Sequence, residues 1–276
     1  MLLLLRIFIL LMNALDNKKI VSKLKECDIK GFTKFDKVVD ENIIKECELT
    51  ALTLFKKYSP ERFSKFTNPT FQDIEFSNAI IDLKKSDKKL FGIIYDTLKS
   101  SLSLKNLSTH PLLVDLACKF LNTGVSSLMI RSTNIRLDVP GDKNNILDWH
   151  YDLYSHDPNH IPSGGLTMVV PFTKFSIENG CPEVCLGSHK KNTKSEFVQG
   201  HGNVSIKHSI DNSYLESFEK VRMIAYPQDL IVFPFLTVHK SGFNISNEVR
   251  VSALIRYYSY DDDSFEPMNE TFSPIL

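Results

Sequence analysis

The sequence predicts a mainly β fold with a helical N-terminal half, in which helices cover one face of an antiparallel barrel or jelly roll. Residues 17–124 carry apolar stripes at helical spacing. After Gly124 the pattern changes to short strand-like runs separated by turn residues. No helical segment separates these runs, which favours antiparallel sheets over a parallel α/β sheet. The chain has 276 residues, enough to bury a substantial core.

Capping residues and apolar stripes predict three helices in the N-terminal half. They run from the N-cap Asp40 to about Tyr58, from Ser86 or Asp87 to about Leu98, and from Thr109-His110-Pro111 to Asn122-Thr123-Gly124. Five strands are expected further on, over residues 128–137, 146–153, 165–171, 229–238 and 249–260.

We expect a single domain over residues 17–276, mainly helical at 17–124 and with the β core at 125–276. Residues 1–16 form an apolar N-terminal segment that we leave outside the fold. Its first twelve residues, interrupted by Arg6, are too short to span a bilayer. A translation start at Met12 and a membrane anchor remain the two alternatives for this segment.

Charge and cysteine usage narrow the class of protein. Lys+Arg and Asp+Glu both number 33, so no basic face is indicated and we expect no nucleic-acid partner. Five cysteines are an odd, sparse set that suits reduced thiols in the cytoplasm. Cys181 and Cys185 form a CxxxC pair without the second pair that a zinc site needs. We therefore expect a cytoplasmic protein that acts on a small molecule without membrane contact; the sequence indicates no oligomeric state.

The chemistry centres on Trp149-His150-Tyr151-Asp152. In a strand, residues two positions apart face the same way about 6.5 Å apart, so His150 and Asp152 can converge on one ion. His239, at the end of the fourth strand, would be a third ligand. Two histidines and one carboxylate leave three positions open on an octahedral ion, which is typical of non-haem Fe(II) oxygenases. The alternative is a core histidine paired with a buried aspartate.

Arg250 lies eleven positions after His239, on a strand that we expect beside it in the barrel. A buried guanidinium requires an anionic partner and suits a carboxylate. Ser252 faces the same way and can donate to that carboxylate. The alternative is an arginine in an ion pair unrelated to the metal.

Four motifs in order resemble the phytanoyl-CoA dioxygenase-like family of Fe(II)/2-oxoglutarate-dependent oxygenases. They are WHYD at 149–152, ENGCPEVCLGSHK at 178–190, DLIVFPFLTVHKSGFN at 229–244 and VRVSALIRY at 249–257. Weaker similarity reaches back to Lys30-Gly31-Phe32.

The resemblance implies a double-stranded β-helix (jelly roll, cupin-like) with Fe(II) held by His150, Asp152 and His239. Arg250, helped by Ser252, would pair with the C5 carboxylate of the co-substrate 2-oxoglutarate. With O2, such an enzyme would hydroxylate an unidentified small molecule and release succinate and CO2. Halogenases of this superfamily carry a small residue where Asp152 stands, so the aspartate favours hydroxylation or a related oxidation.

Two details qualify the resemblance. An aromatic residue that family members often place near 2-oxoglutarate falls on Val169 here. Ser132, Asn134 and Arg136 share one strand face, and we expect one or two of them to reach the C1 carboxylate of 2-oxoglutarate or the substrate. A surface position for Arg136 is the alternative.

Two other functions remain open from the residues alone. One is a non-catalytic cupin-like barrel that binds a metal or ligand, and the other is a metal-dependent hydrolase or isomerase on the same scaffold. The Arg250-x-Ser252 pair favours the oxygenase, because a simple metal barrel needs no buried dicarboxylate anchor. His156 and His160, in a polar loop, are expected to be lid or surface residues.

Overall fold

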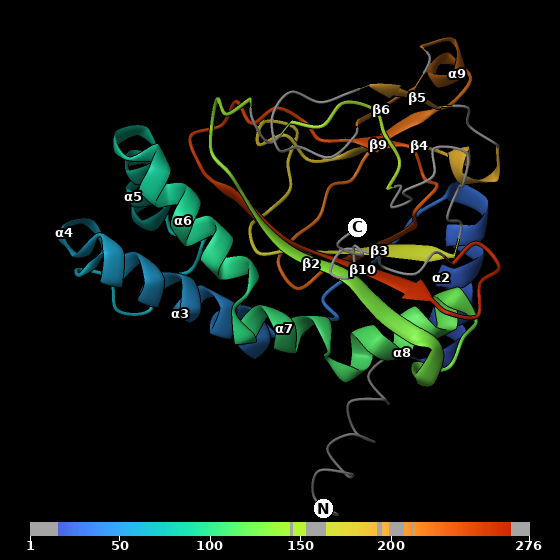
Figure 1. Cartoon of the computed structure of the whole chain (residues 1–276), viewed down its shortest axis with the longest axis horizontal. Coiled ribbons are helices and arrows are strands. Elements are labelled where there is room, and N and C mark those ends of the chain that lie inside the picture. The colour runs from blue at the N-terminus through green and yellow to red at the C-terminus, as the bar shows by residue number, and fades with distance from the viewer. Residues whose placement is uncertain are drawn as a thin grey trace, which may run out of the picture.

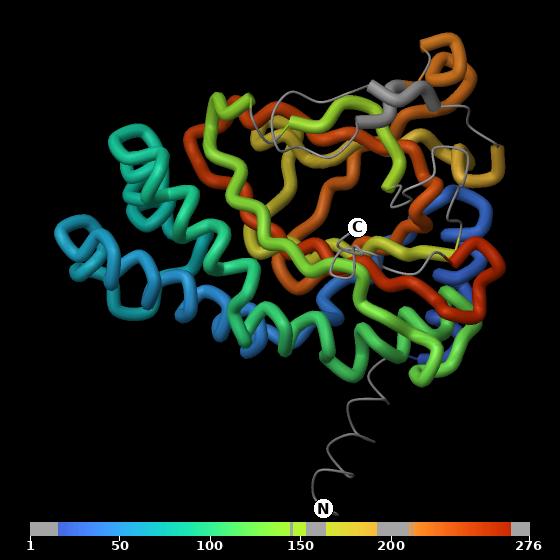
Figure 2. Tube along the Cα trace, in the orientation of Figure 1, coloured from blue at the N-terminus to red at the C-terminus, as the bar shows by residue number. Residues whose placement is uncertain are grey.

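A computed structural model describes residues 16–143, 146–152, 164–191, 195–198, 207–210 and 212–265. The first fifteen residues, which hold the apolar N-terminal run, and the loop with His156 and His160 lie outside these ranges. Figure 1 shows a helical layer along one side of antiparallel sheets, and Figure 2 traces the same path as a tube.

Helices dominate the N-terminal half. Those described are α2 (Asn17–Lys30), α3 (Glu41–Tyr58), α4 (Pro60–Phe63), α5 (Ile74–Ser86), α6 (Lys88–Lys99), α7 (Leu102–Ser108) and α8 (Pro111–Leu121), with α9 (Asn212–Glu216) between two strands later in the chain. The three predicted helices correspond to α3, α6 and α8. Their N-caps Asp40, Asp87 and His110 each accept a hydrogen bond from a backbone N–H of the first turn.

The expectation of a mainly β protein is wrong. Within the described residues, helices cover more of the chain than strands do, so the fold is mixed. The prediction missed α2, α4, α5, α7 and α9, and α9 separates two strands in the part of the chain where no helix was expected. The short α7 offers little periodicity, and α2 carries only two buried residues on a charged background, so its apolar stripe is thin.

Five strands form the larger sheet, in the order β1-β8-β3-β10-β2. Their bounds are Thr33–Phe35, Leu230–Pro234, Gly165–Pro171, Arg250–Ser259 and Leu128–Asp138. A smaller sheet has the order β7-β4-β9 (Lys220–Arg222, Glu183–Cys185 and His239–Lys240), and β5 (Ser195–Val198) pairs with β6 (Lys207–Ile210). All these pairings are antiparallel.

The two faces of the larger sheet have different partners. Alternate residues such as Met168, Val251 and Ile255 are buried in one core with the helices, which cover the outer face (Figure 1). The residues between them, including Val169 and Ile231, pack with Val184 of the smaller sheet in a second core. Because side chains alternate along a strand, Ser252, Leu254 and Arg256 of β10 share this inner face.

Two strand predictions are wrong in ways that affect the site. Residues 146–152 make no regular strand; His150 forms only an isolated bridge with His239. The run 229–238 is not one strand either, because β8 ends at Pro234 and the Thr237 N–H donates to the Pro234 carbonyl in a turn. His239 therefore belongs to the smaller sheet, and β10 is not the strand beside it.

All five cysteines are free. Burial raises the pKa of Cys27 and Cys47 to about 12, so these thiols are inert. No described helix has the length and apolar character needed to cross a bilayer.

Candidate metal centre

Two separate segments, residues 146–152 and the start of β9, meet at the inner face of the larger sheet. One potential ligand atom from each of His150, Asp152 and His239 lies within 4.8 Å of the other two. The two imidazole centroids are 4.3 Å apart. Since ligand bonds of a first-row metal are about 2.0–2.2 Å long, small side-chain adjustments would bring all three to one ion.

Backbone pairing brings the two histidines together. The His150 N–H donates to the His239 carbonyl at 2.9 Å, and the His239 N–H donates back at 2.8 Å. Val184 of β4 pairs with His239 on the other side. The imidazoles thus project from the smaller sheet.

Each imidazole is held in the tautomer that a metal requires. Nδ1 of His150 lies 2.7 Å from the Asp148 carbonyl, and Nδ1 of His239 lies 2.9 Å from the Thr237 carbonyl. A carbonyl can only accept, so both Nδ1 atoms carry the hydrogen and both Nε2 lone pairs remain for an ion.

The Asp152 carboxylate is fixed to the larger sheet. Its Oδ2 accepts from Thr167 Oγ1 at 2.6 Å and from Arg256 Nε at 3.0 Å, while Oδ1 accepts from Arg256 Nη2 at 3.0 Å. Thr167 and Arg256 are cross-strand partners on β3 and β10. The Asp152 N–H also donates to the Phe235 carbonyl at 2.9 Å.

The surroundings of the site keep both imidazoles neutral and the carboxylate charged. Burial, followed by the nearby His239, lowers the pKa of His150 to about 3, and burial lowers the pKa of His239. For Asp152, burial alone would raise the pKa, but the charge of Arg256 outweighs it and holds the pKa below its usual range. Two neutral nitrogen donors and one anionic oxygen fit Fe(II).

Arg250 is buried on the same face as Ser252, as the alternation predicts, but its partner is Asp138. Arg250 Nε and Nη2 donate to Asp138 Oδ2 at 3.3 and 2.6 Å. The remaining nitrogen, Nη1, is buried without a hydrogen-bond partner in the described structure. A buried unpartnered guanidinium nitrogen is suited to an anionic ligand.

Asn134 and Arg136 lie on β2 opposite Leu254 and Ser252. Arg136 is not a surface charge: it donates to Asp138 Oδ1 through Nε at 3.3 Å and Nη2 at 3.0 Å, and to Ser241 Oγ through Nη1 at 3.0 Å. Ser132 stands opposite Arg256, with its Oγ buried and unpartnered within the described ranges. All three β2 residues thus share the inner face.

Reasoning from sequence missed Asp138, Thr167 and Arg256. Two of them carried a signal: Asp138 follows Asn134 and Arg136 at even spacing, and Arg256 follows Arg250 at even spacing. Thr167 carried none, since a threonine in an apolar strand is ordinary.

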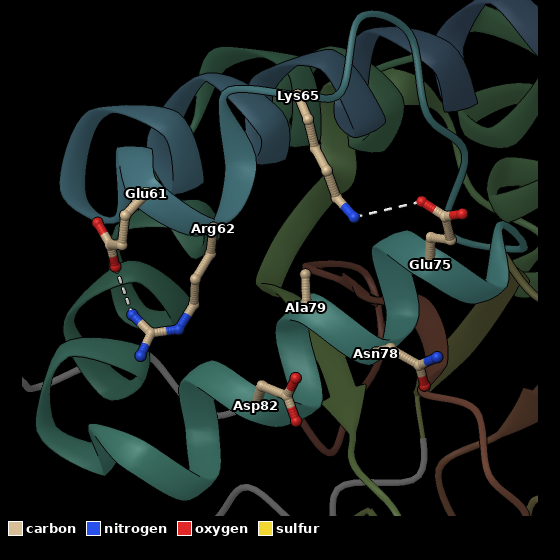
Figure 3. A pocket seen from close by; sticks show the side chains of 7 residues that line it. All are labelled: Glu61, Arg62, Lys65, Glu75, Asn78, Ala79 and Asp82. Carbon is tan, nitrogen blue, oxygen red and sulfur yellow. Dashed lines mark hydrogen bonds and ion pairs between the residues drawn. The ribbon is translucent and has the colours of Figure 1, made fainter.

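A cleft lies in the helical layer, away from this centre. It has a volume of 390 Å³ and is lined from α4, α5 and the turn between them by Glu61, Arg62, Lys65, Glu75, Asn78, Ala79 and Asp82 (Figure 3). Its charges pair among themselves, Arg62 with Glu61 and Lys65 with Glu75. Exposed pairs of this kind are ordinary surface features.

The fold and the site define a mixed helix-and-sheet protein with a candidate His–Asp–His metal site, whose aspartate pairs with the buried Arg256. The model of the phytanoyl-CoA dioxygenase (PhyH) family matches residues 59–252, and the chain belongs to that family. No curated protein matches the chain in sequence.

Solved structures share the fold at low identity. The epimerase SnoN, in complex with Fe3+, alpha ketoglutarate and nogalamycin RO, has a TM-score of 0.61 at 16% identity, covering 95% of this chain and 94% of its own. The alpha ketoglutarate-dependent carbocyclase SnoK has a TM-score of 0.57 at 16% identity, covering 90% of this chain and 85% of its own. EvdO2 from Micromonospora carbonacea var. aurantiaca, complexed with 2-oxoglutarate, has a TM-score of 0.53 at 15% identity, covering 89% of this chain and 91% of its own.

Proposed function

We propose that this protein is an Fe(II)- and 2-oxoglutarate-dependent oxygenase that hydroxylates a small molecule. The observation that carries the proposal is the convergence of His150, Asp152 and His239 on the face that also holds the unpartnered Nη1 of Arg250. A metal centre alone would not require a buried guanidinium with a nitrogen in need of an acceptor. Membership of the phytanoyl-CoA dioxygenase family supports the same reaction class.

In this proposal the residues divide into two groups. His150, Asp152 and His239 hold Fe(II), which supplies the O2-dependent oxidation coupled to decarboxylation of 2-oxoglutarate. Arg250 Nη1 and Ser252 receive the C5 carboxylate, while Asp138 occupies the other edge of the Arg250 guanidinium. Asn134 and Arg136 lie further along β2, where the C1 carboxylate or the substrate would lie.

The apolar wall consists of Val169, Ile231, Phe233 and Leu254. The Phe233 ring centroid is 4.7 Å from that of His239, which shields the imidazole from water on that side. At Val169 an aliphatic side chain replaces the aromatic residue that relatives often carry, so the co-substrate would pack against a smaller surface.

The reaction is proposed as hydroxylation because Asp152 supplies a carboxylate ligand and leaves no ligand position for a halide. Neighbours in the same fold include an epimerase and an alpha ketoglutarate-dependent carbocyclase. The two facing sheets are those of a double-stranded β-helix in this proposal. The free thiols, four of them buried, agree with a cytoplasmic setting.

Anaerobic titration with Fe(II) and 2-oxoglutarate tests the proposal. A visible absorption band should appear only when both are present, vanish in His150→Ala and weaken strongly in Arg250→Ala. His110→Asn, which keeps an N-cap away from the centre, should retain the band. Absence of both the band and succinate formation in air would contradict the oxygenase and leave the metal-binding barrel or the hydrolase.

A further inference from the structure

Arg256 occupies both oxygens of the carboxylate that is expected to bind the metal. Asp152 is buried and exposes only 5% of its surface, and Arg256 exposes 8%. The guanidinium meets Oδ2 through Nε and Oδ1 through Nη2, both at 3.0 Å. A two-point contact between buried ions is among the stronger polar interactions in proteins.

The two oxygens differ in their other partners. Oδ2 also accepts from Thr167 Oγ1 at 2.6 Å, whereas Nη2 of Arg256 is the hydrogen-bond donor described at Oδ1. Oδ1 is therefore the oxygen that can turn to an ion at the smaller loss of hydrogen bonding. Oδ2 can stay on the sheet, held by Thr167 and the Arg256 Nε.

A buried carboxylate without a cation nearby is strongly destabilising. In the metal-free protein, Arg256 supplies that cation. A divalent ion brought to the same carboxylate meets a positive charge already in place, and the repulsion between them weakens binding.

We propose that Arg256 is the built-in counter-ion of Asp152, which keeps the His–Asp–His centre assembled without metal and makes the metal bind less tightly. A bound ion would compete with Nη2 for Oδ1, while the Nε of Arg256 would keep its contact with Oδ2. The proposal rests on the metal centre of the proposed function, but not on its oxygenase chemistry.

The test uses the full-length protein and Mn(II), without 2-oxoglutarate and without O2. Thermal unfolding in EDTA and calorimetric titration with Mn(II) are compared for wild type and Arg256→Gln. The variant should melt at lower temperature in EDTA, gain more in melting temperature from Mn(II) than wild type does, and bind Mn(II) about tenfold more tightly.

Arg136→Gln is the matched control. It removes another inner-face arginine in an ion pair, with Asp138 rather than Asp152. Its stability in EDTA should fall as well, while its Mn(II) affinity and the melting-temperature gain from Mn(II) should stay near the wild-type values.

Weaker Mn(II) binding by Arg256→Gln would overturn the proposal, because Arg256 would then support the ion rather than compete with it. Unchanged stability in EDTA would also overturn it. If Arg256→Gln folds only with Mn(II), the counter-ion role is supported. If Arg256→Gln folds under neither condition, Arg256→Lys is tested instead. Lysine keeps the positive charge but contacts the carboxylate at one point, so this variant should bind Mn(II) more tightly than wild type. Equal or weaker Mn(II) binding by Arg256→Lys overturns the proposal. Loss of succinate formation with intact Mn(II) binding would count against the oxygenase alone.

Discussion

Arg250 and Asp138 lie directly opposite each other on β10 and β2, and their charged groups meet at 2.6 Å. The same carboxylate also receives Arg136 at 3.0 Å, so one buried anion serves two guanidinium groups. Burial alone would raise the pKa of Asp138, but the two arginines outweigh it and lower the pKa. This bridge fixes the end of the inner face where the co-substrate carboxylate is expected.

Removal of the bridging carboxylate should destabilise the fold. Asp138→Ala leaves two buried arginines without their shared counter-ion, and breaking a buried pair in this way costs about 3–5 kcal/mol. Urea unfolding should show that loss in the free energy of unfolding. Glu75→Gln breaks the exposed pair with Lys65 and should cost less than about 1 kcal/mol; equal effects of the two variants would refute the special position of Asp138.

The Arg250 anchor should act on binding of 2-oxoglutarate. Because a hydrogen bond to a charged group is worth about 1.5–3 kcal/mol, Arg250→Ala should raise the KM for 2-oxoglutarate by about 10- to 100-fold and leave Mn(II) binding in place. Ser252→Ala should act in the same direction and more weakly. Succinate formation against 2-oxoglutarate concentration measures both. Arg222→Gln, on the smaller sheet, is the control, and an unchanged KM in Arg250→Ala would exclude the anchor.

A side chain at Gly165 should displace Phe235 and, through it, the metal ligand Asp152. A Cβ at Gly165 would lie 1.9 Å from the Phe235 ring, and the Phe235 carbonyl accepts the Asp152 N–H. Gly165→Ala should therefore destabilise the protein by about 1–3 kcal/mol and weaken Mn(II) binding. Gly92→Ala has open space around it in α6 and should stabilise by about 0.5–1 kcal/mol without any effect on the metal. If Gly165→Ala binds Mn(II) with wild-type affinity, the position of Asp152 does not depend on the packing of Phe235.

Glu48 should make the stability of the helical layer depend on pH. Burial raises its pKa to about 7, against a hydrogen bond from the Phe71 N–H that favours the charged form. Between the ordinary glutamate pKa of 4.5 and the folded-state pKa of about 7, the folded protein keeps the Glu48 proton that the unfolded chain has already released. The contribution to stability is therefore complete below about pH 4.5 and disappears as pH rises through 7.

The matched variant isolates that contribution. Glu48→Gln keeps an acceptor for the Phe71 N–H and loses the titration, so wild type should lose on the order of 2 kcal/mol relative to it between pH 5 and pH 8. Denaturant unfolding across that range measures the difference. Glu46→Gln, exposed on the same helix, controls for charge; parallel curves for wild type and Glu48→Gln would rule the effect out.

Local signals in the sequence predicted much of the fold. Asp40, Asp87 and His110 are helix caps because their side chains accept from the first turn, and this depends only on neighbours in the chain. The alternation of β10 predicted that Arg250 and Ser252 share a face. The convergence of the His150, Asp152 and His239 side chains was predicted from their residue types and from the family resemblance.

One failed prediction concerned a turn hidden in an apolar run, and two depended on contacts between distant segments. The turn after Pro234 runs through Phe235 and Leu236, and these apolar side chains make it look like part of a strand. The pairing of Arg250 with Asp138 is set by the register of β10 on β2, which the sequence does not print. Arg256 was missed because its role depends on Asp152, 104 positions away.

The centre draws its donors from opposite walls: two imidazoles from the smaller sheet, and a carboxylate tied to β3 and β10 of the larger one. A bound ion would cross-link those walls, much as a disulfide joins two strands. Amide exchange in the turn between β8 and β9 would then slow on loading, while the helix-backed outer face would exchange at the same rate with or without the ion.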